Sequence, residues 1–179
     1  MQPAKEKILE ELIDEFLKKN EEEILAQILN LIYGEVVSLA YSFTHNQEDA
    51  KDIFQEVSFK IYKGLRFFRK KAKASTWIYR ITVNTAIDCL RRRKNSQELK
   101  ENCLRSEDMR DKIEKEEKEK ILRKAIDKLS PKQKKVFILR HYHYLKIHQI
   151  SQILNCSPSS VKTHLFRAIE NLRRWVRCV

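Results

Sequence analysis

The chain has 179 residues, of which 37 are Lys or Arg, 25 are Asp or Glu, 2 are Gly and 3 are Pro. So few turn formers, beside long runs of Leu, Ile, Glu and Lys, exclude a β-rich fold and predict an all-α protein of one or two small domains. The net charge of +12 favours a polyanion as partner.

Positive charge is concentrated in two separate blocks. Residues 1–65 carry 7 basic and 13 acidic side chains, whereas residues 66–94 carry 10 and 1. Residues 95–129 carry 10 of each, and residues 130–179 again carry 10 and 1. Two basic blocks around a neutral spacer favour two contacts with nucleic acid over a single solvated face.

Other function classes find little support. The four cysteines form no C-x-x-C pair, and we see no secretory signal or membrane-length apolar run, which predicts a cytoplasmic protein with free thiols and no membrane insertion. The spacing of His141, His143 and His148 fits no helical pair of metal ligands. We find no catalytic constellation, and expect no metal, cofactor or small-molecule substrate.

The first three predicted helices lie in the acidic region. Residues 4–19 form an amphipathic helix that serves packing, and Asn20 is predicted to cap a second helix that runs to about Phe43. A third helix covers residues 47–65. Its acidic line, opposite the apolar stripe, allows three interpretations: a solvated face, part of a magnesium site, or a docking surface for a basic partner. The polar residues concerned are Asp49, Asp52, Gln55 and Glu56.

A basic loop with two aromatic residues precedes the fourth helix. The loop covers residues 65–76, and Ser75 or Thr76 is predicted to cap a helix over residues 76–94. Aromatic, basic and amide side chains along loop and helix are those that bind single-stranded DNA. The set is Phe67, Phe68, Arg69, Lys71, Trp77, Arg80, Asn84 and Arg91. The alternative is that Trp77 fills a gap in the core and the arginines are merely solvated.

The second half of the chain is predicted to end in a helix-turn-helix. Residues 96–118 form a charged linker, between a first domain over 1–95 and a second over 119–179. Isoleucines recur at helical spacing until Asn155, which tolerates a left-handed backbone, and Ser157 then provides the N-cap of the last helix.

The last helix has one apolar and one polar side. Val161, Ala168 and Leu172 lie on its predicted core stripe. Off that stripe lie hydroxyl, basic and aromatic side chains of the kind that reads DNA in the major groove. These are Ser159, Lys162, Thr163, Phe166 and Arg167. The alternative is that Phe166 packs against a neighbouring helix.

Three runs of sequence together resemble a known family. They are NQEDAKDIFQEVSFKIYKGL, FFRKKAKASTWIYRITVNTAIDCLRRR and SSVKTHLFRAIENLRR, and in this order they resemble bacterial RNA polymerase sigma factors of the extracytoplasmic-function (ECF) group, in the sigma-70 family. The resemblance implies two helical domains and a protein that joins core RNA polymerase and directs it to promoter DNA. Members are often held inactive by an anti-sigma factor.

The resemblance also implies roles for the sites. The acidic helix would dock on the clamp helices of the polymerase. The loop and helix from Phe67 to Arg93 would capture the melted minus-ten element, with Asn84 near a flipped base, and Lys162, Thr163, Phe166 and Arg167 match the positions that read the minus-thirty-five element as duplex.

Two departures from the family pattern concern the approach to the first helix of the helix-turn-helix. Tyr144, Leu145 and Lys146 replace Gly-Leu-Ser, and Ser151 stands where alanine is usual.

Two alternative functions remain at this point. One is a self-sufficient helix-turn-helix regulator that binds palindromic duplex DNA as a dimer, with residues 1–95 acting as a sensor or dimerisation domain. The other is a nucleic-acid enzyme that holds magnesium on the acidic helix.

Overall fold

The computed structural model describes residues 3–69, 72–98 and 121–177, and every regular element within these ranges is a helix. The predicted all-α fold is therefore confirmed. The chain divides into two compact units, one drawn mainly from residues before Arg93 and the other mainly from those after it. Lys71, Cys103 and most of the predicted linker lie outside the described residues.

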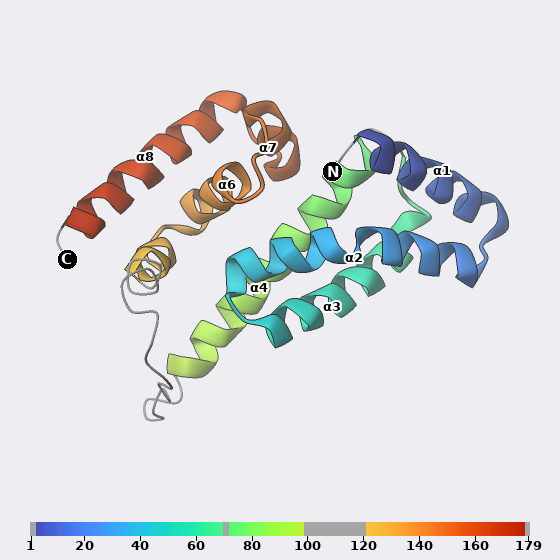
Figure 1. Ribbon diagram of the computed structural model, residues 1–179, viewed down its shortest axis with the longest axis horizontal. Coiled ribbons are helices and arrows are strands. Elements are labelled where there is room, and N and C mark those ends of the chain that lie inside the picture. The colour runs from blue at the N-terminus through green and yellow to red at the C-terminus, as the bar shows by residue number, and fades with distance from the viewer. Residues whose placement is uncertain (1–2, 70–71, 99–120, 178–179) are drawn as a thin grey trace. The chain divides into compact units, whose positions relative to one another are not determined.

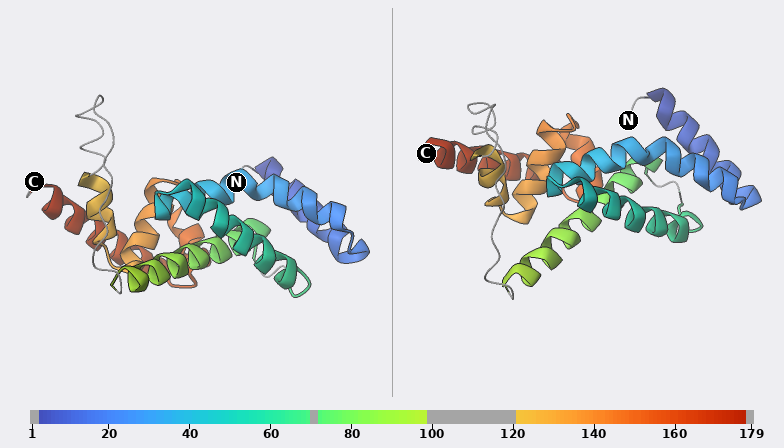
Figure 2. Two further views of the ribbon diagram at one scale, coloured as in Figure 1. Left: turned by 90° about the horizontal axis from the view of Figure 1, so that it is seen from below. Right: turned by 60° about the horizontal axis from the view of Figure 1, so that its bottom comes forward.

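The first unit consists of α1 (Pro3–Lys19), α2 (Glu22–Thr44), α3 (Gln47–Leu65) and α4 (Ala74–Glu98) (Figure 1). Helix α2 packs against both α1 and α3. Both views of Figure 2 show α2 and α3 side by side, with α4 crossing them. Large apolar side chains from all four helices fill the core between them, among them Leu9, Ile13, Phe16, Ile28, Ile32, Leu39, Ile53, Ile61, Leu65 and Ile78.

Two left-handed residues and one side-chain cap set the turns between these helices. Asn20 has φ 54° and its N–H donates to the Phe16 carbonyl at 2.8 Å, so it ends α1. The prediction that Asn20 caps α2 is therefore wrong, because its backbone conformation closes the preceding helix. His45, with φ 53°, ends α2, and the Asn46 side chain then accepts from the Asp49 N–H at 3.0 Å to cap α3.

Helix α2 corrects another expectation. By length and composition it could cross a membrane, with a mean hydropathy of 1.5 over 18 residues, so the chain does contain a membrane-length apolar run. This is weak evidence for a membrane span, because the core helix of a compact domain passes the same test. Its buried residues recur at helical spacing, from Ile24, Ile28 and Ile32 to Val36 and Leu39, and face the neighbouring helices.

Helix α4 is held by a buried face that is wider than predicted. Tyr79, Val83 and Ala86 are buried as expected, and Thr82 and Thr85 are completely buried with them. Their Oγ atoms are satisfied, since Thr82 donates to the Ile78 carbonyl and Thr85 accepts from Lys60. Both threonines fall outside the predicted stripe because that stripe counts apolar residues alone.

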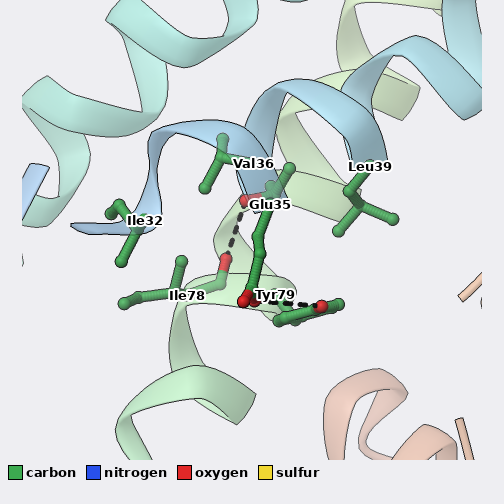
Figure 3. Close-up of a pocket in the computed structure, with 7 residues that line it drawn as sticks. Ile32, Glu35, Val36, Leu39, Ile78 and Tyr79 are labelled. Carbon is green, nitrogen blue, oxygen red and sulfur yellow. Dashed lines mark hydrogen bonds between the residues drawn. The ribbon is translucent and has the colours of Figure 1, made fainter. Parts of the chain in front are cut away.

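The side chains of α2 and α4 close against each other around Tyr79 (Figure 3). Its hydroxyl donates to the Glu35 carboxylate at 3.4 Å. Burial and the nearby negative charge raise the pKa of Tyr79, which keeps its hydroxyl protonated as a donor.

The second unit contains a helical segment over residues 121–127, then α6 (Pro131–His141), α7 (Ile147–Leu154) and α8 (Pro158–Arg177). Its core combines apolar residues of the first segment with those of α6 and α8, namely Ala125, Ile126, Leu129, Phe137, Ala168 and Leu172. Ser130 caps α6 with a reciprocal bond to Gln133. The predicted cap of α8 is confirmed, because the Ser160 N–H donates to Ser157 Oγ at 3.1 Å.

The helix-turn-helix keeps its backbone despite the departures in sequence. Asn155 has φ 50°, as predicted, and Tyr144 adopts the same left-handed region with φ 52°. Gln149 Oε1 accepts from the Lys146 N–H at 2.8 Å, which ties down the start of α7. Ser151 is buried but satisfied, because its hydroxyl donates to the His148 carbonyl at 2.7 Å.

Tyr144 gives a test of backbone strain. We expect Tyr144→Gly to raise the free energy of unfolding by ~1 kcal/mol, because a left-handed backbone costs a residue with a Cβ about 1–2 kcal/mol and the greater chain entropy of glycine offsets part of that gain. Calorimetric unfolding of the full chain measures the change. Asn155→Gly is the matched control and should gain less, since asparagine tolerates this conformation; an equal or larger gain there would contradict the interpretation.

Candidate functional site

An aromatic step, formed by Phe68 and Trp77, lies at the start of α4. The two ring centroids are 5.0 Å apart with 34° between the ring planes. Trp77 also covers Gly64 at the end of α3, where any larger residue would find no room, because a Cβ there would lie 2.9 Å from Trp77 Cζ2. Trp77 is half-buried, so it fills a gap against Gly64 without being sealed in the core.

The other predicted strand-binding residues follow one face of α4. Arg80, Asn84 and Arg91 stand 3, 7 and 14 positions after Trp77, which at 100° per residue places all four on the side opposite the buried threonines. Asn84 is exposed, and Arg91 is exposed with Asp88 at 3.3 Å. In the preceding loop Arg69 is exposed and Phe67 is 80% exposed.

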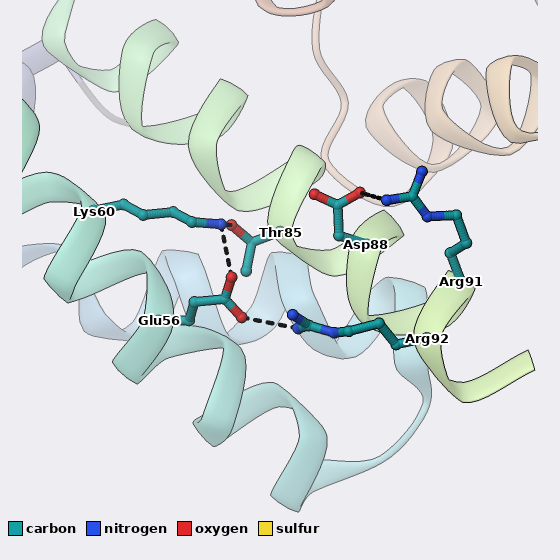
Figure 4. Close-up of polar contacts among 6 residues, drawn as sticks. All are labelled: Glu56, Lys60, Thr85, Asp88, Arg91 and Arg92. Carbon is teal, nitrogen blue, oxygen red and sulfur yellow. Dashed lines mark hydrogen bonds and ion pairs between the residues drawn. The ribbon is translucent and has the colours of Figure 1, made fainter. Parts of the chain in front are cut away.

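Part of the acidic line of α3 binds α4, and part of it is exposed to solvent. Glu56 accepts from Lys60 Nζ at 2.7 Å and from Arg92 at 3.0 Å, while Lys60 also donates to Thr85 Oγ1 at 2.9 Å (Figure 4). These contacts connect α3 to α4. The hydrogen bond from Lys60, with that from Arg92, lowers the pKa of Glu56, so its carboxylate stays charged. Asp49 is likewise half-buried.

What remains on the outside of α3 is an exposed face that we call the α3 face. Asp52 and Gln55 lie there, as predicted, and are exposed. Phe59 and Tyr62 continue the same face with 56% and 43% exposure, and Lys63 Nζ lies 4.2 Å from the Phe59 ring centroid. These two aromatic residues were not predicted as part of a site, although their offsets of 7 and 10 from Asp52 place them off the apolar stripe.

An open groove beside the α3 face also escaped prediction. It lies between α2 and the start of α3, where Tyr33 and Tyr41 are partly exposed. The Tyr33 ring meets Phe54 edge to face, with centroids 4.8 Å apart. The remaining lining residues are Gly34, Val37, Ser38, Gln47 and Lys51. In sequence these aromatic residues look like ordinary members of a hydrophobic helix.

In the second unit, α8 presents the residues predicted to meet duplex DNA. Ser159, Lys162, Thr163 and Arg167 are all exposed. Phe166 is 67% exposed, which does not favour the alternative that it packs on a neighbouring helix. Thr163 Oγ1 donates to the Ser159 carbonyl at 3.1 Å, within the first turns of the helix.

The histidines near α6 have an ordinary structural setting. The His141 ring lies against Phe137 with centroids 4.5 Å apart, and burial lowers its pKa. Within the described ranges, no group of three His, Cys, Asp or Glu side chains could hold a metal ion. Nothing in the described chain therefore supports the magnesium alternative for the acidic helix.

Comparison with known families gives two matches in chain order. The profile described as Sigma-70 region 2 matches residues 30–96, and that described as Sigma-70, region 4 matches residues 119–172. The chain is 34% identical over 135 residues to RNA polymerase sigma factor SigV of Bacillus subtilis, a span of 75% of this chain and 80% of the relative. It is 28% identical over 174 residues to ECF RNA polymerase sigma factor SigW of the same organism, covering 90% and 93%.

Solved structures have the same fold at low sequence identity. CnrH in complex with the cytosolic domain of CnrY is similar with a TM-score of 0.67 and 17% identity, over 93% of this chain and 96% of that one. Sigma factor RpoE in complex with the anti-sigma factor NepR from Bartonella quintana is similar with a TM-score of 0.63 and 20% identity, over 85% and 96%.

The Glu56 contacts give a test by pH. Because its cationic neighbours hold the folded-state pKa of Glu56 below its ordinary value of 4.5, this stabilisation is fully present above that value and is lost as the pH falls through the folded-state pKa. We expect Glu56→Gln to lower the melting temperature of the chain at pH 7, with the deficit shrinking as the pH falls below 4.5. Glu48→Gln, whose ion pair with Lys51 is exposed on the same helix, should show a smaller deficit. A deficit independent of pH would contradict the assignment.

Proposed function

This chain belongs to the sigma-70 family of RNA polymerase sigma factors, in its ECF group, and on that premise we propose how its two units divide promoter recognition. As a sigma factor it acts with RNA polymerase in transcription initiation and is not itself an enzyme. We assign core-polymerase docking and capture of the melted minus-ten element to the first unit. The second unit reads the minus-thirty-five element as duplex.

The observation that carries the proposal is the common face of Trp77, Arg80, Asn84 and Arg91 on α4. The opposite face of α4 is fixed in the core by Thr82, Thr85 and their neighbours, so the polar face is the one that can meet a ligand. An unpaired strand offers flat bases and phosphates. The aromatic step can stack on the bases, exposed Arg91 can contact phosphates, and the Asn84 amide can hydrogen-bond to a base edge.

Core polymerase docking is assigned to the α3 face. Exposed Asp52 and Gln55 provide charge and hydrogen-bonding groups, while Phe59 and Tyr62 add exposed aromatic area next to them. Aromatic residues at the centre of an interface commonly carry most of its binding energy, with charged groups setting orientation. Glu56 contributes less directly than the sequence suggested, since its carboxylate is used to hold α3 against α4.

Duplex reading is assigned to α8 because its exposed side combines the groups that contact base edges. Lys162 and Arg167 can donate to guanine or phosphate, and Phe166 can contact a thymine methyl group. The excess of positive charge over residues 130–179, with 10 basic side chains and 1 acidic one, favours approach to DNA.

Two further partners or properties follow from the family. We propose that an anti-sigma factor can hold this chain inactive, an assignment supported by complexes such as that of RpoE with NepR, which share the fold. The chain would act in the cytoplasm, where RNA polymerase acts. A dimeric helix-turn-helix regulator, with residues 1–95 as its sensor or dimerisation domain, is the alternative, but the two family matches in chain order favour the sigma factor.

The division between single strand and duplex is tested by two substitutions measured in parallel. In the complex with core polymerase, Asn84→Ala should weaken binding to DNA whose minus-ten element is already melted by about tenfold, while leaving binding to a minus-thirty-five duplex unchanged. Arg167→Ala should do the reverse, with a similar loss. Fluorescence titration with the two DNA fragments measures both. Equal effects of either variant on both fragments would contradict the proposed division.

The docking assignment is tested by charge reversal. Asp52→Arg should weaken binding to core polymerase by about tenfold or more, because it places a like charge against a basic partner surface. Competition against the unmodified chain for core polymerase measures the loss. Glu23→Arg, an equal charge change at the exposed start of α2, is the matched control; a comparable loss there would show a general charge effect instead of a docking site.

A further inference from the structure

The start of α4 has no N-cap side chain of its own. The first helical hydrogen bond runs from the Trp77 N–H to the Lys73 carbonyl at 3.2 Å, so Lys73 occupies the N-cap position. A lysine side chain has no oxygen to accept from the free N–H groups of the first turn. The predicted caps Ser75 and Thr76 lie inside the helix, which begins at Ala74, and that prediction is therefore wrong.

A carboxylate from α1 takes the place of the missing cap. Glu6 Oε1 accepts from the Ser75 N–H at 3.1 Å, across 69 positions of sequence. Glu6 is 9% exposed, although most glutamates in an amphipathic helix face solvent. A negative charge at this end of α4 also interacts favourably with the helix dipole. Glu6 therefore does for α4 what Asn46 does for α3 from the adjoining residue.

Lys5, the residue next to Glu6 on α1, is connected to the same part of α4 through Glu35 of α2. Lys5 Nζ lies 3.3 Å from Glu35 Oε1, and the Tyr79 hydroxyl donates to Glu35 Oε2 (Figure 3). Tyr79 follows Ser75 by one helical turn. The first turn of α1 thus reaches α4 through two carboxylates, one of its own and one on α2.

We propose that Glu6 is a positioning residue for capture of the melted strand. Trp77 lies in the first turn of α4, the turn that Glu6 caps, and Phe68 of the preceding loop packs on Trp77. The cap therefore fixes where the helix begins and how the aromatic step is presented. This inference rests on the proposed role of α4. It extends the strand-binding apparatus to α1, outside residues 30–96 that match Sigma-70 region 2.

The experiment measures binding of the complex with core polymerase to DNA with a melted minus-ten element. Glu6→Ala should weaken this binding about threefold to tenfold, the range expected for loss of one helix cap. Affinity for core polymerase, measured by competition, should stay within about twofold of the unmodified chain. Glu6→Gln, which keeps an oxygen acceptor, should lose less. Glu10→Ala, on an exposed position of the same helix, is the matched control and should lose nothing.

A local cap should rescue the defect. Asparagine is among the best N-cap residues, so Lys73→Asn in the Glu6→Ala background should raise melted-strand binding. The same change in the unmodified background should not raise it, because the cap is already present there. A gain that occurs only in the Glu6→Ala background identifies a lost cap. If Glu6 acted by general packing, a substitution at Lys73 would not restore binding.

The outcomes separate the role of Glu6 from the role of α4. Normal binding by Glu6→Ala beside a loss in Asn84→Ala would overturn the role of Glu6 and leave the function of α4 intact. Equal losses of core-polymerase and melted-strand binding would also overturn it, because they would mark Glu6 as a general stability residue. Normal binding by both variants would overturn the strand-capture role of α4 itself.

Discussion

Burial of one face of α4 decides what the first unit can present to a ligand. Ile78, Thr82, Val83, Thr85 and Ala86 are each nearly or fully inaccessible to solvent, so α4 cannot rotate without exposing apolar surface or leaving buried hydroxyls without partners. The side opposite this face then points outward as a consequence. A row of aromatic, basic and amide groups is held there by the orientation of the whole helix.

Polar contacts add direction to this burial. Glu35 accepts a hydrogen bond from the Tyr79 hydroxyl near the start of α4, and Glu56 accepts one from Arg92 further along the helix. Exposed ion pairs contribute little stability. The Tyr79–Glu35 and Arg92–Glu56 contacts instead fix the position of α4 along its neighbours. A hydrogen bond breaks when a helix slides by a small distance that apolar packing still tolerates. One acidic residue of α3 thereby becomes part of the scaffold, while Asp52 stays on the surface.

In the second unit, the orientation of the exposed helix depends on backbone conformation as well as on burial. Its three-helix core of residues such as Ile126, Phe137 and Leu172 orients α8, and left-handed residues at 144 and 155 bracket α7. Asn155 adopts this conformation at low cost, but Tyr144 does so with strain. The turn geometry is therefore imposed by the packing of the flanking helices, and glycine is dispensable at that position.

The sequence alone determined the helices, the residues that end α7 and cap α8, and the polar side of each amphipathic helix. These features depend on neighbours within one or two turns: Asn155 and Ser157 act on adjacent backbone, and the face that carries Asn84 or Arg167 follows from helical periodicity. The same local patterns, taken in order, were enough to indicate the family. They could not distinguish residues that are polar because they meet solvent from residues that are polar because they meet another helix.

Tertiary structure decided that distinction. Glu6 and Glu56 look like surface glutamates in sequence, yet one caps a helix 69 positions away and the other binds Arg92 on a different helix. Phe59 and Tyr62 lie off the apolar stripe of α3 by periodicity, yet only the structure shows that their rings are exposed, at 56% and 43%. Sequence periodicity gives the direction of a side chain from its own helix axis. What lies in that direction depends on how the helices pack, and that is set by the sum of many long-range contacts.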